Sequence, residues 1–132
     1  MKNKPNQKIC ISLGAPYHLP DLQKKEPVAW TVKNSCRIGD LAVFYLTAPI
    51  SAVVGYGVII SEPWFESQSD WQDKFFAEID QIQTFQESDF IRIKYIRQLF
   101  PEWRYWLQPR QSVIAPEDLT FAFKELLEMN NK

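Results

Sequence analysis

The sequence predicts one small α+β domain built on a curled, mostly antiparallel sheet or partial barrel. Several short segments alternate in the manner of strands and are separated by Gly, Pro or polar turns. Helical periodicity is confined to two segments, so strands and helices do not alternate as they do in a parallel βαβ sheet. The 132 residues are enough for one hydrophobic core and too few for two, so we expect a single domain over residues 1–132.

The amino-terminal half carries the clearest strand patterns. Four segments have the alternation or the unbroken apolar character of strands, namely residues 8–13, 28–32, 41–47 and 52–61. The third is apolar almost throughout, as expected for a strand covered on both faces. A polar, proline-bracketed connection over residues 17–26 joins the first two. Before the third strand we expect a turn at Gly39 and Asp40, with Gly39 at positive φ.

Two segments have helical periodicity. In the first, Ser69 and Gln72 fit a capping box, with apolar residues at helical spacing at Trp71, Phe75, Ile79 and Ile82. The second opens at Pro116 with two acidic residues behind it. Its predicted buried stripe consists of Leu119, Ala122, Phe123, Leu126 and Leu127. Between these helices we expect a strand over residues 90–100 and a short strand over residues 112–114.

Composition and charge exclude several classes of protein. With 15 basic and 16 acidic residues the net charge is −1, so any contact with nucleic acid must be local rather than a whole basic face. The longest apolar run is too short to span a bilayer, and the first residues lack the apolar stretch of a signal peptide. Cys10 and Cys36 form no CxxC motif, so we expect a reducing, cytoplasmic location and no disulfide scaffold.

The sequence offers little support for catalysis, a cofactor or a metal. It contains no GxSxG, HExxH, Walker or GxGxxG motif. His18, the single histidine, lies in the polar segment PYHLP without a matched nucleophile beside it, which is typical of a solvated loop histidine. We therefore expect a protein that is not an enzyme.

Aromatic residues are in excess, with five Trp, five Tyr and nine Phe. Most such rings fill cores, but recognition of an unstacked base also needs aromatic faces, together with basic side chains for the phosphates. Candidates for the walls of a base pocket are Trp30, Tyr45, Trp103 and Trp106. Candidates for phosphate contacts are Arg104, Arg110, Arg92 and Lys94. Core packing for the aromatic residues, and a solvated strand face for Arg92 and Lys94, stay open as alternatives.

The segment over residues 30–63 resembles the EVE domain. The shared pattern is a Trp, a Gly-Asp turn, a strand with Phe-Tyr, and a strand of small residues that ends near a Pro. In this sequence these are Trp30, Gly39 with Asp40, Phe44 with Tyr45, residues 55–60 and Pro63. EVE domains belong to the PUA-like superfamily with the YTH and ASCH domains. The resemblance therefore implies a PUA-like curled mixed β-barrel with flanking helices.

The resemblance also implies a function. A noncatalytic pocket would accept one modified base of DNA or RNA, with Trp30 as a wall, Tyr45 as its neighbour and Ser12 in contact with the base edge. Asp40 would fix the turn before its strand. The implied partners are a nucleic acid that carries the modified base and a protein of a restriction or RNA-modification system.

Two alternatives stay open. One is an ASCH-like amidohydrolase acting on a small amide or nucleoside, for which Lys33 with Thr31 is the nearest candidate set. The other is a protein-interaction domain whose exposed aromatic side chains dock a partner.

Overall fold

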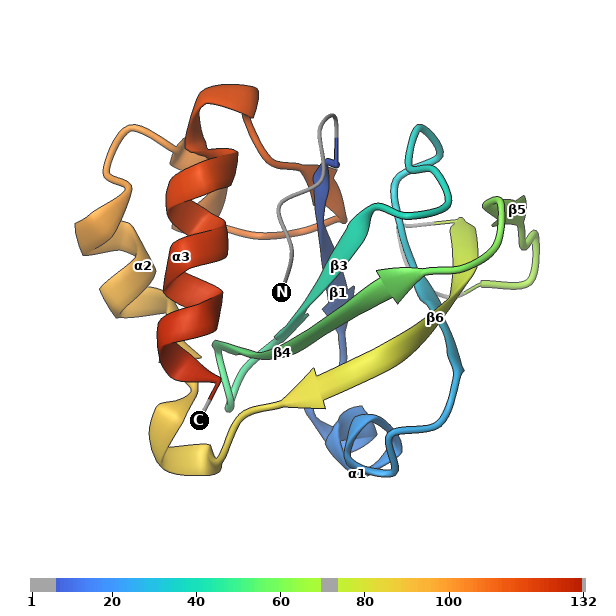
Figure 1. The fold of residues 1–132 in the computed structure, drawn as a ribbon, viewed down its shortest axis with the longest axis horizontal. Coiled ribbons are helices and arrows are strands. Elements are labelled where there is room, and N and C mark those ends of the chain that lie inside the picture. The colour runs from blue at the N-terminus through green and yellow to red at the C-terminus, as the bar shows by residue number, and fades with distance from the viewer. Residues whose placement is uncertain (1–6, 70–73, 132) are drawn as a thin grey trace.

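The computed structural model describes residues 7–69 and 74–131, and these have the predicted α+β architecture. The strands are β1 (Ile9–Gly14), β2 (Val28–Thr31), β3 (Leu41–Leu46), β4 (Ala52–Ile59), β5 (Trp64–Phe65), β6 (Phe75–Thr84), β7 (Ile91–Arg92) and β8 (Val113–Ile114). The α-helices are α1 (Leu19–Gln23), α2 (Ile93–Leu99) and α3 (Thr120–Asn130). Short 3-10 helices are η1 (Pro16–His18), η2 (Glu87–Asp89), η3 (Arg104–Leu107) and η4 (Glu117–Leu119). A curled sheet forms the centre, with α2 and α3 side by side against it and α1 apart from them (Figure 1).

The sheet is mixed and almost closes on itself. The hydrogen-bonded order is β2-β6-β4-β3-β1-β8, with β5 paired to β6 and β7 paired to β4. β1 runs parallel to β3, whereas the other pairs among the described residues are antiparallel. At the gap between β2 and β1, the Thr31 hydroxyl donates a hydrogen bond of 2.6 Å to the Leu13 carbonyl oxygen. Side chains therefore join the two strands where no backbone ladder does.

The four strands predicted in the amino-terminal half are present as β1 to β4. β3 is buried along its whole length, as its apolar sequence predicted. The terminal helix α3 buries Phe123, Leu126 and Leu127 as predicted, although Ala122 is exposed. Among the described residues, no helix has the length and apolar character that a bilayer span requires.

The helix predicted from Ser69 to Ile82 is wrong, because residues 75–84 form strand β6 between β2 and β4. Ala77 and Ile79 are buried in the alternation of a strand, and Gln81 then interrupts it at a φ of 53°. This bulge shifts the alternation by one residue, so that Ile82 is the next buried side chain. The resulting three-residue spacing imitates a helix. Gln72 and Trp71 of the predicted helix lie outside the described residues.

The strand predicted over residues 90–100 is also wrong beyond its first residues. Ile91 and Arg92 form β7, which pairs with β4, and the chain then turns into helix α2. Ile96 is fully buried on α2, three residues after the half-buried Ile93, so burial follows a helical period. The alternation in the sequence was too short to distinguish these two structures.

The turn before β3 depends on Asp40, as expected. The Asp40 carboxylate accepts hydrogen bonds from the backbone N–H of Arg37 at 2.9 Å and of Lys8 at 3.1 Å. Gly39 has the predicted positive φ, at 97°, and donates to the Ile59 carbonyl oxygen at 2.8 Å. Asp40 is 6% exposed, so these bonds are shielded from water. One buried carboxylate thus ties the start of β1 to the turn that leads into its parallel neighbour.

We predict that Asp40→Asn lowers the free energy of unfolding by about 1–3 kcal/mol, because charge-assisted hydrogen bonds to two backbone N–H groups are weakened. Urea unfolding followed by circular dichroism measures this change. Glu125→Gln on the exposed face of α3 is the control and should change stability by less than about 0.5 kcal/mol. Equal effects of the two substitutions would contradict the structural role of Asp40.

Candidate ligand-binding cavity

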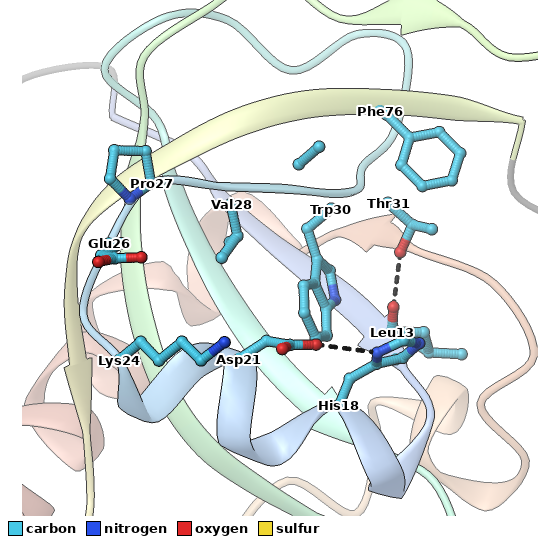
Figure 2. A pocket seen from close by; sticks show the side chains of 12 residues that line it. Leu13, His18, Asp21, Lys24, Glu26, Pro27, Val28, Trp30, Thr31 and Phe76 are labelled. Atoms are coloured by element: carbon cyan, nitrogen blue, oxygen red, sulfur yellow. Dashed lines mark hydrogen bonds and ion pairs between the residues drawn. The ribbon is translucent and has the colours of Figure 1, made fainter.

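A cavity of about 430 Å³ lies beside the gap between β1 and β2. Its wall is formed by the end of β1, the segment through η1 and α1, strand β2 with the residues before it, and Phe76 of β6. Figure 2 shows the side chains of α1 and β2 facing each other across it. Cavities of about 300–1,000 Å³ are typical of sites that bind small molecules or parts of larger ones.

Trp30 forms the aromatic wall of the cavity. The residue is 6% exposed, and its ring packs edge-on against Phe44, with centroids 5.2 Å apart. On the cavity side, the His18 ring meets it at 75° and 5.7 Å. A Cβ atom on Gly14 would lie 2.2 Å from Cζ2 of Trp30, so glycine is required for this close approach. The indole N–H of Trp30 is buried and has no acceptor among the described residues.

Polar side chains line the opposite side. His18 Nδ1 lies 3.2 Å from Asp21 Oδ2, and the two side chains are 40% and 49% exposed. Lys24 and Glu26 add one charge of each sign. Donors, acceptors and aromatic rings therefore surround the same space.

Thr31 also lines the cavity, but its hydroxyl already takes part in a buried network. Thr31 donates to the Leu13 carbonyl oxygen at 2.6 Å and accepts from Ser112 Oγ at 3.2 Å. Ser112 Oγ in turn accepts from the backbone N–H of Leu13 at 3.2 Å. This hydroxyl pair holds β1, β2 and the segment before β8 together and gives Thr31 a structural role.

Of the five residues predicted for a base pocket, the structure brings Trp30 to this cavity and not the other four. Tyr45 is buried against Trp106, with ring centroids 5.5 Å apart, and burial raises the pKa of its hydroxyl. Ser12 is fully buried in β1, with its hydroxyl 3.7 Å from Cys10 Sγ.

Trp103 belongs to the aromatic cluster beneath α3. Its ring packs against Trp106 at 5.4 Å and against Phe123 at 5.7 Å. Trp103 is 8% exposed and Trp106 is fully buried, so both fill the core at this end of the sheet. The packing alternative weighed for these two residues is the one that the structure supports.

The predicted phosphate contacts fall into two groups. Arg104 and Arg110 line a second cavity of about 470 Å³, together with Tyr105, Leu107, Gln108 and Gln111. Arg92 instead donates to the Ile50 carbonyl oxygen at 3.0 Å and lies over the Phe90 ring, and Lys94 is exposed on α2. The structure thus brings Arg104 and Arg110 together and leaves Arg92 and Lys94 outside their cavity.

Several lining residues were not predicted, in particular His18, Asp21, Lys24 and Glu26. They belong to the polar connection over residues 17–26, in which His18 was interpreted as a solvated loop histidine. One feature could have revealed them, because this connection leads directly into the strand of Trp30 and is too short to leave its vicinity. Phe76 was missed because it was assigned to the incorrect helix.

Solved structures with the same fold include proteins of diverse organisms. A hypothetical protein from Leishmania major matches with a TM-score of 0.71 at 11% identity, over 97% of both chains. Human THYN1, in complex with DNA that contains 5-methylcytosine, matches with a TM-score of 0.66 at 11% identity, over 96% of this chain and 99% of THYN1. An ASCH protein from Zymomonas mobilis matches with a TM-score of 0.63 at 10% identity, over 90% of this chain and 95% of its own.

This chain has the PUA-like fold. Because the EVE-domain protein THYN1 and the ASCH protein are both among its structural neighbours, the predicted resemblance is confirmed at the level of fold. No family model matches the sequence, and no curated protein is significantly similar to it.

In this PUA-like domain we predict that Gly14→Ala displaces the Trp30 indole, because the added Cβ would overlap its ring. The indole N–H resonance of Trp30 should shift in the ¹H–¹⁵N spectrum, with a loss of stability of about 1–3 kcal/mol from overpacking. Ser35→Ala, in the exposed loop before β3, serves as the control. An unchanged Trp30 resonance in Gly14→Ala would show that the ring does not depend on this contact.

Proposed function

We propose that this PUA-like domain binds nucleic acid by accepting one modified base in the cavity beside Trp30. The observation that carries the proposal is the composition of the cavity wall, where Trp30, His18 and Phe76 provide aromatic surface around about 430 Å³. A base removed from its stack needs such flat apolar surface, together with polar groups at its edge. Ordinary core packing would not require an open cavity at this position.

The polar groups of the wall suit the edge of a base. Asp21 and Glu26 offer carboxylate oxygens to an exocyclic amine, and Lys24 offers donors to a carbonyl oxygen or a ring nitrogen. The Trp30 indole N–H is itself buried, so the base edge meets these carboxylates and the ammonium group rather than this donor. This mixture supports recognition of a heterocycle more than recognition of a purely apolar ligand.

The likeness to THYN1 adds support, since that protein was crystallised with DNA that contains 5-methylcytosine. At 11% identity the base bound by THYN1 does not determine the base bound by this chain, so DNA and RNA are both tested as ligands. The domain has a net charge of −1, which favours contacts at a few phosphates over binding along a whole duplex.

For the phosphates we propose Arg104 and Arg110. Their cavity includes Gln111, which directly precedes the Ser112 that bonds to Thr31 on the wall of the base cavity. The segment through Gln111 and Ser112 thus connects the walls of the two cavities, and this connection supports Arg104 and Arg110 as the contacts for the backbone of a strand with one base beside Trp30. We propose Arg92 and Lys94 as contacts of a longer nucleic acid that extends towards α2.

The proposal predicts saturable quenching of tryptophan fluorescence by a short oligonucleotide with one particular modified base. The panel contains 5-methylcytosine, 5-hydroxymethylcytosine, N6-methyladenine and unmodified controls, each as single and double strands of DNA and RNA. Trp30→Phe should weaken binding by about three- to tenfold, because part of the stacking surface is lost.

Substitution by phenylalanine separates binding from stability better than Trp30→Ala does. The alanine variant would also lower the free energy of unfolding by about 3–5 kcal/mol through lost core packing. Phe121→Ala, 61% exposed on α3, is the control and should bind as the unsubstituted protein does. A flat response to every oligonucleotide would contradict the proposal and favour a protein or small-molecule partner.

We predict that Arg104→Ala weakens binding by a similar factor for all oligonucleotide sequences. The number of counterions released on binding should fall by about one. Affinity measured at several salt concentrations gives the slope of log K against log salt. The same titration with Lys94→Ala tests whether the contact extends to α2. An unchanged slope in Arg104→Ala would remove this residue from the phosphate contacts.

Hydrolysis is the second candidate function. Lys24 and two carboxylates, those of Asp21 and Glu26, line one cavity in a fold that an ASCH protein shares, whereas the Thr31 hydroxyl is engaged in the buried network. Lys33, the lysine first considered for this role, is exposed and is not part of the cavity wall, so Lys24 takes its place as the candidate. Incubation with N-acylated nucleosides, followed by chromatography, distinguishes the two functions, since a binding module returns its ligand unchanged.

A further inference from the structure

We propose that the exposed aromatic surface of β5 and the start of β6 is a docking site for an arginine- or lysine-rich segment of a partner protein. The site consists of Trp64, the supporting ring of Phe76, and the carboxylates Glu62, Glu66 and Glu78. Phe76 also lines the cavity beside Trp30, so the two sites adjoin, but this proposal does not depend on the proposed base-binding function.

The aromatic side chains come from two paired strands. Trp64 lies directly opposite Phe76, so these two side chains share one face of the paired strands, whereas Phe65 and Phe75 share the other. The rings of Trp64 and Phe76 are stacked at 26°, with centroids 6.5 Å apart. Figure 1 shows β5 beside β6 at the rim of the sheet, away from α2 and α3.

The Trp64 ring is more exposed than core packing would leave it. Trp64 is 38% exposed on a strand of only two residues, and Phe76, on which it stacks, is half-buried. A stacked aromatic pair that is open to solvent at the rim of the sheet is a surface on which a partner can dock.

The charge around the rings indicates the kind of partner. Glu62 precedes β5 and Glu66 follows it, and both side chains are exposed. Glu78 is exposed on β6, two residues from Phe76 and therefore on the same face of the strand. Lys74 directly precedes β6, and its ammonium group is bound to the Ser69 carbonyl oxygen.

An aromatic surface with carboxylates around it complements a cation. The faces of Trp and Phe attract guanidinium or ammonium groups, with Trp the strongest of the aromatic side chains, and the carboxylates pair with the same groups. Nucleic acid would bring phosphates next to Glu62, Glu66 and Glu78, which is unfavourable. The observations therefore favour a basic peptide over a nucleic-acid strand at this surface.

The test is a ¹H–¹⁵N titration of the protein with the capped peptide Gly-Arg-Gly-Arg-Gly-Arg, and with its Gly-Glu counterpart at equal ionic strength. The arginine peptide should shift the resonances of Trp64, Glu66 and Phe76, and the glutamate peptide should not. Trp64→Ala and Glu66→Gln should each weaken arginine-peptide binding by about two- to fivefold.

Phe121→Ala and Glu125→Gln on α3 are matched controls, since they remove an exposed ring and an exposed carboxylate elsewhere. If Trp64→Ala disturbs the fold, Glu78→Gln tests the same surface through an exposed carboxylate. Shifts confined to other residues, or binding unaffected by all of these substitutions at the site, would overturn the proposal. So would stronger shifts at Trp64 with a single-stranded oligonucleotide than with the arginine peptide.

Discussion

The hydrogen bond from Thr31 to the Leu13 carbonyl oxygen spans the place where the curled sheet fails to close. β1 takes its backbone partners from β3 and β8, and β2 takes its own from β6, so no ladder joins β1 to β2. Ser112 completes the connection, because its hydroxyl donates to Thr31 and accepts from the Leu13 N–H. Since these groups are buried, leaving any of them without its partner would cost about 1–3 kcal/mol. Two hydroxyl side chains thus replace the backbone pairing that would have sealed the barrel, and the space beside them stays open.

The cavity follows from this arrangement. β2 is the last strand at one end of the sheet, so one of its edges has no strand beside it. The cavity lies beside β2, where His18, Asp21 and Lys24 face Trp30. The chain must also pass from β1 to β2 through the η1–α1 segment, so its polar side chains are held against the Trp30 ring. Gly14 completes the arrangement, because only a residue without Cβ lets β1 end against the edge of the indole. The same few residues therefore determine both the closure of the sheet and the shape of the site.

The sequence alone predicted the features that depend on local pattern and missed those that depend on how distant segments meet. The apolar run of β3, the turn at Gly39 and Asp40, and the terminal helix follow from alternation, backbone freedom and helical spacing. β6 was mistaken for a helix because a bulge at Gln81 changes the spacing of its buried residues, and a bulge leaves no local signature in this segment. Among the aromatic residues, composition could not separate Trp30 on the cavity from Trp103 in the core. Their environments differ through contacts with His18 and Phe123, which lie on other elements.

The near-zero net charge conceals an uneven distribution of charge. Arg104 and Arg110 line the cavity next to Ser112, whereas Glu62, Glu66 and Glu78 surround the exposed rings of β5 and β6. At physiological ionic strength, charges are screened beyond about 8 Å, so each surface acts on a partner through its own groups and not through the net charge. An anionic ligand is attracted to the first region and a cationic one to the second. The two proposed ligands would therefore contact groups of opposite charge, and Phe76, which borders both the cavity beside Trp30 and the surface at Trp64, is the place where they would meet.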